Sequence, residues 1–403
     1  MNPIKRWLDD ACAKPSLRYV ETCDGLRTLA VLIVAWFHIW QQSWLFPGLT
    51  VLGRDISLDP LVRSGYMWVD MMILISGFCL YLPWARRRYE GGKPPRTLDF
   101  YAKRLARIHP SYLLTIAVMF AVAAATHAYH SSAHMVRDLA SHLTYTHMFF
   151  YDAYYSSNLG GALWTLAVEM QFYLIFPLLA RAFDRLPATT FAAMVAVSLA
   201  FRGWVGANCR DVSMFFNQLP AYLDTFALGM MAASIHACLA QRKHGALSRM
   251  LCSALTIGIL PLLWQVVRAQ ASCPNVEAIR LGQMNNRLAM GLLGACFLVS
   301  SANAGLVLRR ILGNPITKFF SGISLQFYIW HQTIAVWLIT YKVIPSAYEN
   351  PNWEGDPVWQ MRYTIACFGL SLLVAAVITY GFERPVARKL LRAYDARKKQ
   401  KGI

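Results

Sequence analysis

Charged side chains are scarce in this sequence, and acidic side chains are the scarcer kind. Lys, Arg, Asp and Glu make up 15% of the 403 residues, whereas hydrophobic residues make up 56%. A soluble chain of this length would carry about a quarter charged residues. The hydrophobicity also excludes a disordered chain, and the length excludes a small disulfide-stapled scaffold. The shortage of charge therefore indicates a protein that lies in a membrane.

Metal-binding patterns are also missing. The nine cysteines form no CxxC pair, and none lies beside a histidine at metal-ligand spacing, so we expect no metal site. The chain does carry 39 Lys and Arg against 21 Asp and Glu, a net charge of +18. Such an excess can indicate nucleic-acid binding, but here the basic residues lie in short clusters between long apolar runs. We therefore attribute the basicity to membrane topology and expect no nucleic-acid partner.

A helix that spans a bilayer needs about 20 mainly apolar residues. Ten segments meet this requirement: 26–46, 64–84, 109–129, 162–180, 187–206, 213–236, 247–268, 284–303, 317–343 and 360–383. The less apolar stretch 131–151 predicts a short interfacial or re-entrant helix. We expect an all-α polytopic membrane protein with a cytoplasmic N-terminal segment (1–25), a membrane domain (26–383) and a basic cytoplasmic tail (384–403). We expect no cleavable signal peptide and no appended soluble domain.

Orientation follows from the distribution of Lys and Arg between the connecting segments. With the N-terminus inside, the inner segments hold 28 of these residues and the outer segments hold 7. Both termini are therefore predicted to be cytoplasmic. This orientation places Cys209 and Cys273 in outer loops, where they either form a disulfide or remain two unpaired thiols.

Ionisable residues inside predicted spans are costly to bury and are functional candidates by default. The set comprises Arg27, His38, Asp70, Glu169, Asp224 and His331. At about 1.5 Å per residue, all but Arg27 fall in the middle-to-outer layer of the membrane, where they could line a shared polar cavity.

Arg27 and His38 give the most specific signal. They are eleven residues apart, about three helical turns, and so share one helix face. A single ligand that touches both must be long, anionic at one end and reactive at the other, which is the shape of an acyl-coenzyme A. A buried neutral His38 could accept the proton of an attacking alcohol. Alternatively, His38 is a core histidine bonded to a carbonyl, and Arg27 is a topology anchor.

Two other pairs lie at helical spacing. Arg104 and Arg107 can point the same way and suit phosphate binding, although anchoring at the inner membrane surface also explains them. Glu169 and Tyr173 share a face at i,i+4, and Glu169 could orient His38 or form a structural ion pair with an arginine. Asp70 and Asp224 admit the same two interpretations, and His331 is either functional or a packing histidine.

Six motifs in order resemble the acyltransferase-3 family, the bacterial membrane acyltransferases that O-acylate envelope glycans and some small molecules. CDGLRTLAVLIVAWFH resembles the family's Arg, ten residues, His opening, and VDMMILISGFCLY resembles its second-helix motif. FYAKRLARIHPSY resembles the Arg-x-x-Arg loop, and LWTLAVEMQFYLIFP resembles the motif that begins Trp-Ser-Leu. SLQFYIWHQ and FERP resemble the two closing motifs. Thr165 stands where Ser is usual, and Met170 replaces a second Glu, so Glu169 serves alone.

The resemblance implies a membrane O-acyltransferase that takes an acyl group, most often acetyl, from cytoplasmic acetyl-CoA. The acceptor it implies is a hydroxyl of an envelope glycan or lipid-linked sugar, at the bacterial cytoplasmic (inner) membrane. We assign the coenzyme A phosphates to Arg27, Arg104 and Arg107, and the general base to His38. Glu169 and Asp70 would orient His38 or a bound hydroxyl. The acceptor side would be lined by Trp164, Tyr173, Asp224 and His331.

Two other functions remain open. A transporter or flippase for an envelope glycan would also place charges in a midplane cavity, but it predicts an internal repeat, and the sequence shows none. A non-catalytic scaffold for glycan assembly would leave Arg27 and His38 freely replaceable.

Overall fold

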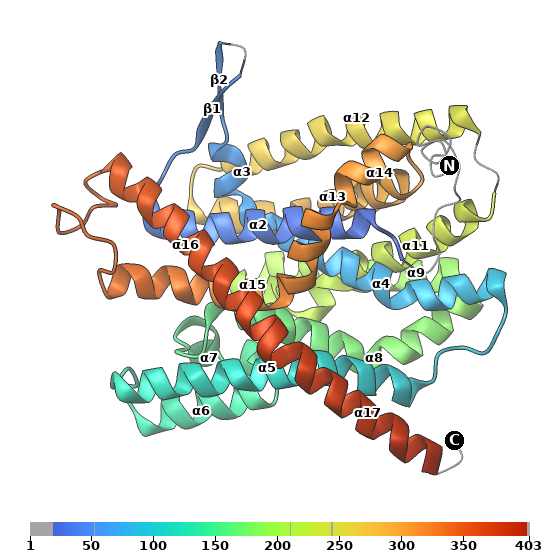
Figure 1. Cartoon of the computed structure of the whole chain (residues 1–403), viewed down its shortest axis with the longest axis horizontal. Helices are drawn as coiled ribbons and strands as arrows, with labels where there is room; N and C mark the ends of the chain where they lie inside the picture. The colour runs from blue at the N-terminus through green and yellow to red at the C-terminus, as the bar shows by residue number, and fades with distance from the viewer. Residues whose placement is uncertain (1–18, 52, 210, 243–244, 401–403) are drawn as a thin grey trace, which may run out of the picture.

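The computed structural model describes residues 19–51, 53–209, 211–242 and 245–400, and it is helical almost throughout. Figure 1 shows long helices packed roughly side by side into one bundle, with the short helices and loops at its two ends. The long helices are α2 (Thr22–Ser43), α4 (Val69–Glu90), α5 (Thr97–Ala125), α8 (Trp164–Arg185), α9 (Pro187–Asn208), α11 (Leu223–Ala240), α12 (Ala246–Ala271), α13 (Val276–Ala302), α15 (Pro315–Thr340), α16 (Pro357–Ile378) and α17 (Arg384–Gln400).

Short elements connect these helices. The short α-helices are α3 (Asp59–Arg63), α6 (Ser132–Leu143), α7 (Tyr151–Tyr155), α10 (Ser213–Phe216) and α14 (Leu306–Leu312). The 3-10 turns are η1 (Gly65–Trp68), η2 (His147–Phe149), η3 (Gly161–Leu163) and η4 (Leu219–Tyr222), and a π-turn, η5 (Thr379–Glu383), joins α16 to α17. The predicted tail 384–403 therefore begins inside an almost continuous helix.

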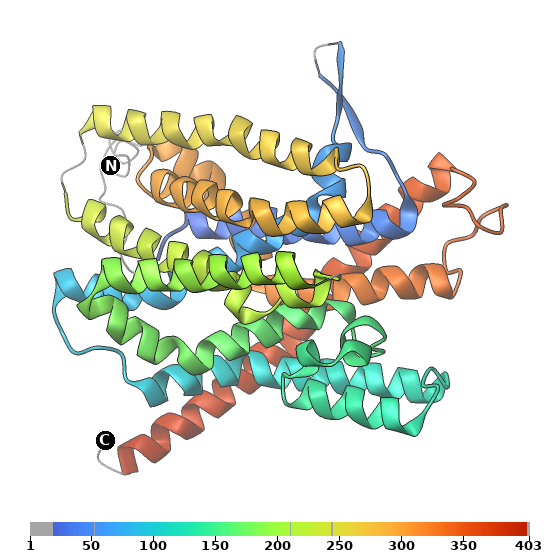
Figure 2. The ribbon, with the colours of Figure 1, turned by 180° about the vertical axis from the view of Figure 1, so that it is seen from behind.

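A two-stranded hairpin that the sequence did not predict follows α2. Strand β1 (Gly48–Val51) pairs antiparallel with β2 (Arg54–Ser57), and Leu49 lies opposite Ile56. Gly53 adopts a φ of 77° in the turn between them, a left-handed value that glycine tolerates without strain. The hairpin projects from the bundle in both ribbon views (Figures 1 and 2).

The helical character of the ten predicted spans is confirmed, whereas their number stays a prediction. In the described part of the chain, eight helices are long and apolar enough to cross a membrane. A ninth is added if α13 and the α14–α15 segment, which meet at a bend of 120°, form one broken span. The stretch 131–151 is confirmed as short helices, α6 and η2. The protein is therefore a multi-pass membrane protein of the all-α class.

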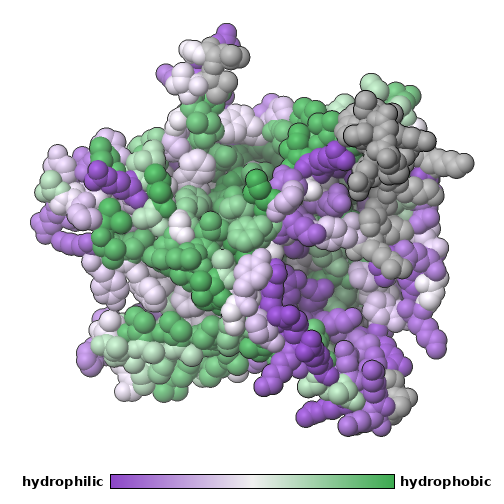
Figure 3. All heavy atoms as spheres, viewed as in Figure 1, coloured by the Kyte–Doolittle hydropathy of each residue, from purple (hydrophilic) through white to green (hydrophobic). Residues whose placement is uncertain are grey.

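The two ends of the bundle differ in polarity. Figure 3 shows hydrophobic side chains over the left and middle of the visible face, and hydrophilic side chains gathered at the right, where α17 ends. The start of α2 lies at this same end in Figure 1. The last turn of α17 contributes Arg397, Lys398 and Lys399 to it. This is the distribution expected of a membrane protein whose basic end faces the cytoplasm.

Close packing at the centre depends on glycines between α4 and α11. A Cβ on Gly229 of α11 would lie 2.2 Å from the Leu74 carbonyl oxygen, and a Cβ on Gly77 of α4 would lie 2.5 Å from the Phe226 carbonyl oxygen. Backbone atoms cannot yield at such distances, so both positions require glycine. The contact holds α4, which carries Ser76 and Cys79, at a fixed depth in the bundle.

Candidate active site

A cavity of about 1040 Å³ opens between α2, α4, α5, α8 and α15. We name it the arginine cavity, because Arg27 of α2 and both Arg104 and Arg107 of α5 line it. Glu169 and Tyr173 of α8 form another part of its wall. The structure therefore brings together five residues that the sequence selected from three separate segments.

Arg27 is held in the cavity wall by neutral partners. Its Nη1 donates to the Ser321 hydroxyl of α15 at 3.4 Å, and its Nη2 contacts the Cys79 Sγ at 3.6 Å. The Ser321 hydroxyl in turn donates to an Asp24 carboxylate oxygen at 2.7 Å, so this acid is one hydrogen bond removed from Arg27. Arg27 is therefore positioned without being neutralised.

Positive charge exceeds negative charge in this cavity. Three guanidinium groups line it, whereas Glu169 is the single carboxylate among the described lining residues. The Arg104 guanidinium lies 5.9 Å from the centroids of both the Phe100 and the Tyr173 ring, as in a cation–π contact. Like charges that lie close together repel one another unless a counter-charge joins them. The cavity therefore carries an excess of positive charge.

Glu169 is engaged within its own wall. Its Oε2 accepts a hydrogen bond from the Tyr173 hydroxyl at 3.1 Å, which confirms that the i,i+4 pair shares a face. The Ser76 hydroxyl is a second hydrogen-bond partner of the carboxylate. The structure does not bring Glu169 into contact with His38, and it places Tyr173 with the arginines rather than beside His331.

His38 and His331 lie next to each other, their ring centroids 5.2 Å apart. The Nδ1–H of His38 donates to Gln41 Oε1 at 3.0 Å, and the Nδ1–H of His331 donates to the Tyr328 carbonyl at 2.7 Å. Because both acceptors are oxygens without a hydrogen, each Nδ1 carries the proton and each Nε2 keeps a lone pair. His331 is fully buried and its Nε2 has no partner, whereas His38 is partly exposed. The arrangement leaves His38 as an accessible base.

The histidine pair and the arginine cavity share the helix α15. Arg27 contacts Ser321 and His38 contacts His331, so both residues face α15, as their eleven-residue spacing predicts. Tyr328 lines the cavity, and its ring centroid lies 5.6 Å from that of His331. Tyr328 of α15 therefore contacts both the arginine cavity and the histidine pair.

A second, smaller cavity of about 570 Å³ continues from the first. Arg27 and Cys79 line both cavities, and the second extends to Tyr19, Asp24 and Arg86 near the start of α2 and the end of α4. We name it the inner vestibule. Together the two cavities extend from Arg86 near the basic end of the bundle to Tyr328 of α15.

Asp70 and Asp224 lie outside the arginine cavity, each in a buried ion pair. Asp224 accepts from Arg202 Nη2 at 2.6 Å, and Asp70 Oδ1 lies 3.3 Å from Arg287 Nε. Arg287 is fully buried, and its guanidinium lies 3.7 Å from the centroid of the Tyr222 ring. Breaking such a pair by removing one partner typically costs about 3–5 kcal/mol. The cluster joins α4, α9, α11 and α13.

Three expectations about the site change as a result. Asp70 is bonded to Arg287, which is the structural ion pair that the sequence left as one of its two interpretations. Trp164 packs against Tyr222, with ring centroids 6.1 Å apart, and therefore belongs to the ion-pair cluster rather than to the cavity lining. The disulfide alternative for Cys209 and Cys273 is wrong, since both cysteines are free.

Sequence reasoning missed several residues of these sites. Arg202 was counted in an outer loop, yet it is buried in α9. Arg287 lies within a predicted span, a signal that could have singled it out as it did Asp70. Cys79 and Tyr328 are uncharged, so the search for charged residues inside the predicted spans did not select them. Gln41 was not considered as the partner of His38.

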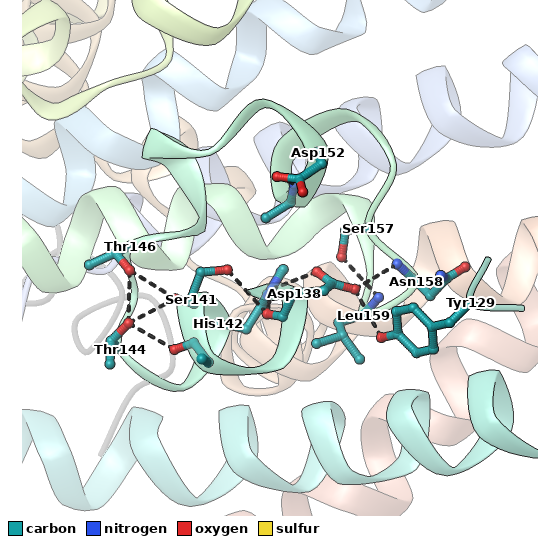
Figure 4. Close-up of polar contacts among 12 residues, drawn as sticks. Tyr129, Asp138, Ser141, His142, Thr144, Thr146, Asp152, Ser157, Asn158 and Leu159 are labelled. Carbon is teal, nitrogen blue, oxygen red and sulfur yellow. Dashed lines mark hydrogen bonds and ion pairs between the residues drawn. The ribbon is translucent and has the colours of Figure 1, made fainter. Parts of the chain in front are cut away.

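A polar cluster fastens α6 to the loop before α8. Figure 4 shows Tyr129, Ser157 and Asn158 pointing toward the Asp138 carboxylate, which lies beside His142. The Tyr129 hydroxyl donates to Asp138 at 2.9 Å, the Asn158 N–H donates at 3.1 Å, and the His142 Nδ1 lies 3.1 Å from Asp138 Oδ1. The His142 ring stacks on the His147 ring with centroids 3.9 Å apart. The cluster closes the side of the bundle next to α5.

Acid should destabilise this cluster. Burial alone would raise the pKa of Asp138, but hydrogen bonds from His142, Ser157 and Asn158 outweigh burial and hold that pKa below its ordinary value. Burial, followed by the neighbouring His142, lowers the pKa of His147. Both groups bind fewer protons folded than unfolded, so their stabilisation is present at neutral pH and lost on acidification. The loss begins below about pH 6.5 for His147 and below about pH 3.9 for Asp138.

We therefore expect the melting temperature to fall between pH 7 and pH 5, and to fall less in His147→Phe. Asp138→Asn should lower the melting temperature already at pH 7, because hydrogen bonds to a charged group are worth about 1.5–3 kcal/mol. Thermal unfolding in detergent at several pH values checks both. A His147→Phe variant with the wild-type pH response would contradict this account.

Comparison with known proteins identifies the family. The model described as an acyltransferase domain, Acyl_transf_3, matches residues 21–381, most of the chain. The chain belongs to the acyltransferase-3 family. This confirms the resemblance inferred from the six motifs. The match covers the arginine cavity, the histidine pair, the ion-pair cluster and all of the inner vestibule except Tyr19 and Val20.

Curated relatives of the chain are O-acetyltransferases by name. The chain is 24% identical to O-acetyltransferase OatA of Staphylococcus aureus (strain NCTC 8325), over 96% of this chain and 60% of OatA. It is 22% identical to the S. aureus (strain COL) protein SACOL0978, named as a candidate O-acetyltransferase, over 81% of this chain and 52% of that protein. The chain thus spans little more than half the length of these relatives. No solved structure gives a significant match.

Proposed function

We propose that this acyltransferase-3 protein transfers an acetyl group from cytoplasmic acetyl-CoA to a hydroxyl of an envelope or exported glycan, in the bacterial cytoplasmic membrane. The observation that carries the proposal is the arginine cavity, where three arginines face one carboxylate and lead toward a histidine pair. Arginine binds phosphate bidentately and stays charged when buried. The names of the S. aureus relatives support acetyl as the group and O-acylation as the reaction.

The distance between Arg27 and His38 along α2 favours a long acyl donor. Arg27 and His38 are eleven residues apart along α2, a rise of about 16 Å. A donor whose phosphates contact Arg27, Arg104 and Arg107 would therefore place its thioester well inside the membrane, beside Tyr328. The nucleotide end would lie in the inner vestibule, which opens among Tyr19 and Arg86.

His38 acts as the general base in this mechanism. Its Nε2 takes the proton of the acceptor hydroxyl while the hydroxyl oxygen attacks the thioester carbonyl carbon. The carbon–sulfur bond then breaks, and the departing coenzyme A thiolate takes the proton back from the imidazolium. The Nδ1–H of His38 stays bonded to Gln41 throughout, which fixes the tautomer. His331 lies fully buried beside His38 and packs against its ring.

Cys79 offers a direct test of the donor path, because its thiol lines both the arginine cavity and the inner vestibule. We expect acetyl-CoA to slow the alkylation of Cys79 by a maleimide at least tenfold in purified protein. Cys296, which is exposed on α13, serves as the internal control and should react at the same rate with or without acetyl-CoA. Peptide mass spectrometry measures both rates. Equal protection of both cysteines, or of neither, would count against donor binding in these cavities.

A further inference from the structure

A pocket of about 920 Å³ lies at the end of the bundle opposite the basic end. The last turn of α15, the connection 341–356 and the first turn of α16 line it. Figure 1 shows this connection at the left edge of the molecule, far from the end of α17. We name it the outer aromatic pocket. It is separate from the arginine cavity, with which it shares no lining residue.

The lining combines aromatic faces with amide groups. Trp353 is 73% exposed and Tyr348 is 53% exposed, although both side chains are largely apolar. Asn350 and Asn352 lie between them in the lining. In the described part of the chain, neither amide side chain has a hydrogen-bond partner within the protein. Aromatic faces beside free amides match a sugar residue, which presents C–H groups on one face and hydroxyl groups around its rim.

The pocket is preformed. Asp356 caps α16 by accepting from the Val358 and Trp359 N–H groups at 3.0 and 3.1 Å. The Trp359 Nε1–H donates to the Ile344 carbonyl at 3.1 Å and so ties α16 to the connection. The Asn350 carbonyl accepts from two backbone N–H groups, those of Trp353 and Glu354, each at 3.0 Å. A ligand would therefore bind without first ordering this loop.

The charge of this pocket differs from that of the arginine cavity. Its described lining holds one cation, Lys342, and one anion, Glu349. The segment 344–359 contains no Lys or Arg and carries Glu349, Glu354 and Asp356. A lining without net charge, beside an acidic segment, does not attract anionic lipid headgroups or anionic polymers. A neutral ligand suits it better than a phosphorylated one.

Contacts connect the pocket to the histidine pair. The Trp353 ring lies 5.1 Å from the ring of Trp44, which directly follows α2. The Trp44 Nε1–H donates to the Gln41 carbonyl, and the Gln41 side chain accepts from His38. Trp44 is six residues beyond His38, about 9 Å along a helix. A chain held in the pocket could thus present its next unit to His38.

We propose that the outer aromatic pocket binds a neutral sugar unit of the acceptor glycan and guides the adjacent unit to His38. The inference rests on the proposed function for the identity of the acceptor. Beyond the proposed function, it specifies where the glycan binds and that the bound sugar unit is uncharged. Trp353 supplies the stacking face, and Asn350 and Asn352 bind hydroxyl groups.

The test measures glycan retention, which needs no catalysis. Full-length protein is immobilised in an amphipol, since a maltoside detergent would itself offer a sugar to the pocket. It is incubated with the neutral fraction of the envelope glycans of the host bacterium, and retained sugar is quantified after acid hydrolysis. We expect Trp353→Ala and Asn350→Ala to retain less than a tenth of the wild-type amount. Phe46→Ala, which alters a 65% exposed ring outside the pocket, should retain as much as wild type.

Several results would overturn the proposal. Equal retention by wild type and Trp353→Ala would do so, as would no retention by wild type. Weaker insertion of Trp353→Ala into bilayers with unchanged retention would instead make Trp353 a membrane-interface aromatic. If glycan retention depends on Trp353 but the protein fails to bind acetyl-CoA, the pocket is a glycan site and the proposed transferase function is wrong. If the protein binds acetyl-CoA but retains no glycan, the proposed donor site stands and the proposed glycan site is wrong.

Discussion

Replacing His38 by alanine is expected to lower the rate of acetyl transfer at least about 100-fold, the smallest effect usually seen when a general base is removed. The structure gives the reason: His38 is the accessible member of the pair, and Gln41 holds it with Nε2 free. The affinity for acetyl-CoA should stay within about twofold of wild type, because the arginine contacts lie about 16 Å away along α2. Initial rates of thiol release, measured with acetyl-CoA binding, check both.

The controls separate catalysis from folding. His38→Gln keeps much of the side-chain volume and should lose activity to the same extent. His130→Ala, which removes an exposed histidine outside the long helices, should transfer at the wild-type rate. Size-exclusion profiles establish that each variant is folded. Substantial transfer by His38→Gln would remove His38 from the mechanism.

Replacing Arg107 by alanine is expected to weaken acetyl-CoA binding at least tenfold, since a hydrogen bond to a charged group is worth about 1.5–3 kcal/mol. Arg107→Lys should also bind more weakly, because lysine cannot form a bidentate contact with phosphate. The same variants should not lower the melting temperature of the ligand-free protein. Removing one of three neighbouring guanidinium groups relieves repulsion when no anion is bound.

Arg88→Ala is the matched control for Arg107. Arg88 lies at the same end of the bundle, but it is bonded to Asp184 rather than directed into the arginine cavity. Isothermal titration of each variant with acetyl-CoA, at two salt concentrations, measures the affinity and its charge dependence. If Arg107→Ala and Arg88→Ala bind equally well, the arginine cavity is not the donor site.

Spacing along one helix predicted which candidate residues share a helix face. The eleven-residue spacing of Arg27 and His38 placed both against α15, and the pairs Arg104–Arg107 and Glu169–Tyr173 line one cavity. Each of these predictions needed only the helical period of 3.6 residues. The family resemblance, carried by the same residues, extended them to the whole membrane domain.

The helical period could not predict contacts between helices that are far apart in the sequence. Asp70 pairs with Arg287, 217 residues away, and no periodic pattern links two positions at that separation. The ion pair engages Asp70 with Arg287, and the sequence could not say which arginine would be its partner. The outer aromatic pocket was equally hidden, because its shape depends on how the connection 341–356 folds against α16. Loops of this kind lack the periodicity that helices have.

The central claim is that an acetyl group passes from a donor on the basic side of the membrane to an acceptor on the other side. The most direct measurement uses oriented vesicles with labelled acetyl-CoA inside and envelope glycans outside. The account predicts labelled glycan outside and free coenzyme A thiol inside, in equal amounts, and neither with His38→Gln. Label that appears only when donor and acceptor are supplied on the same side would contradict it.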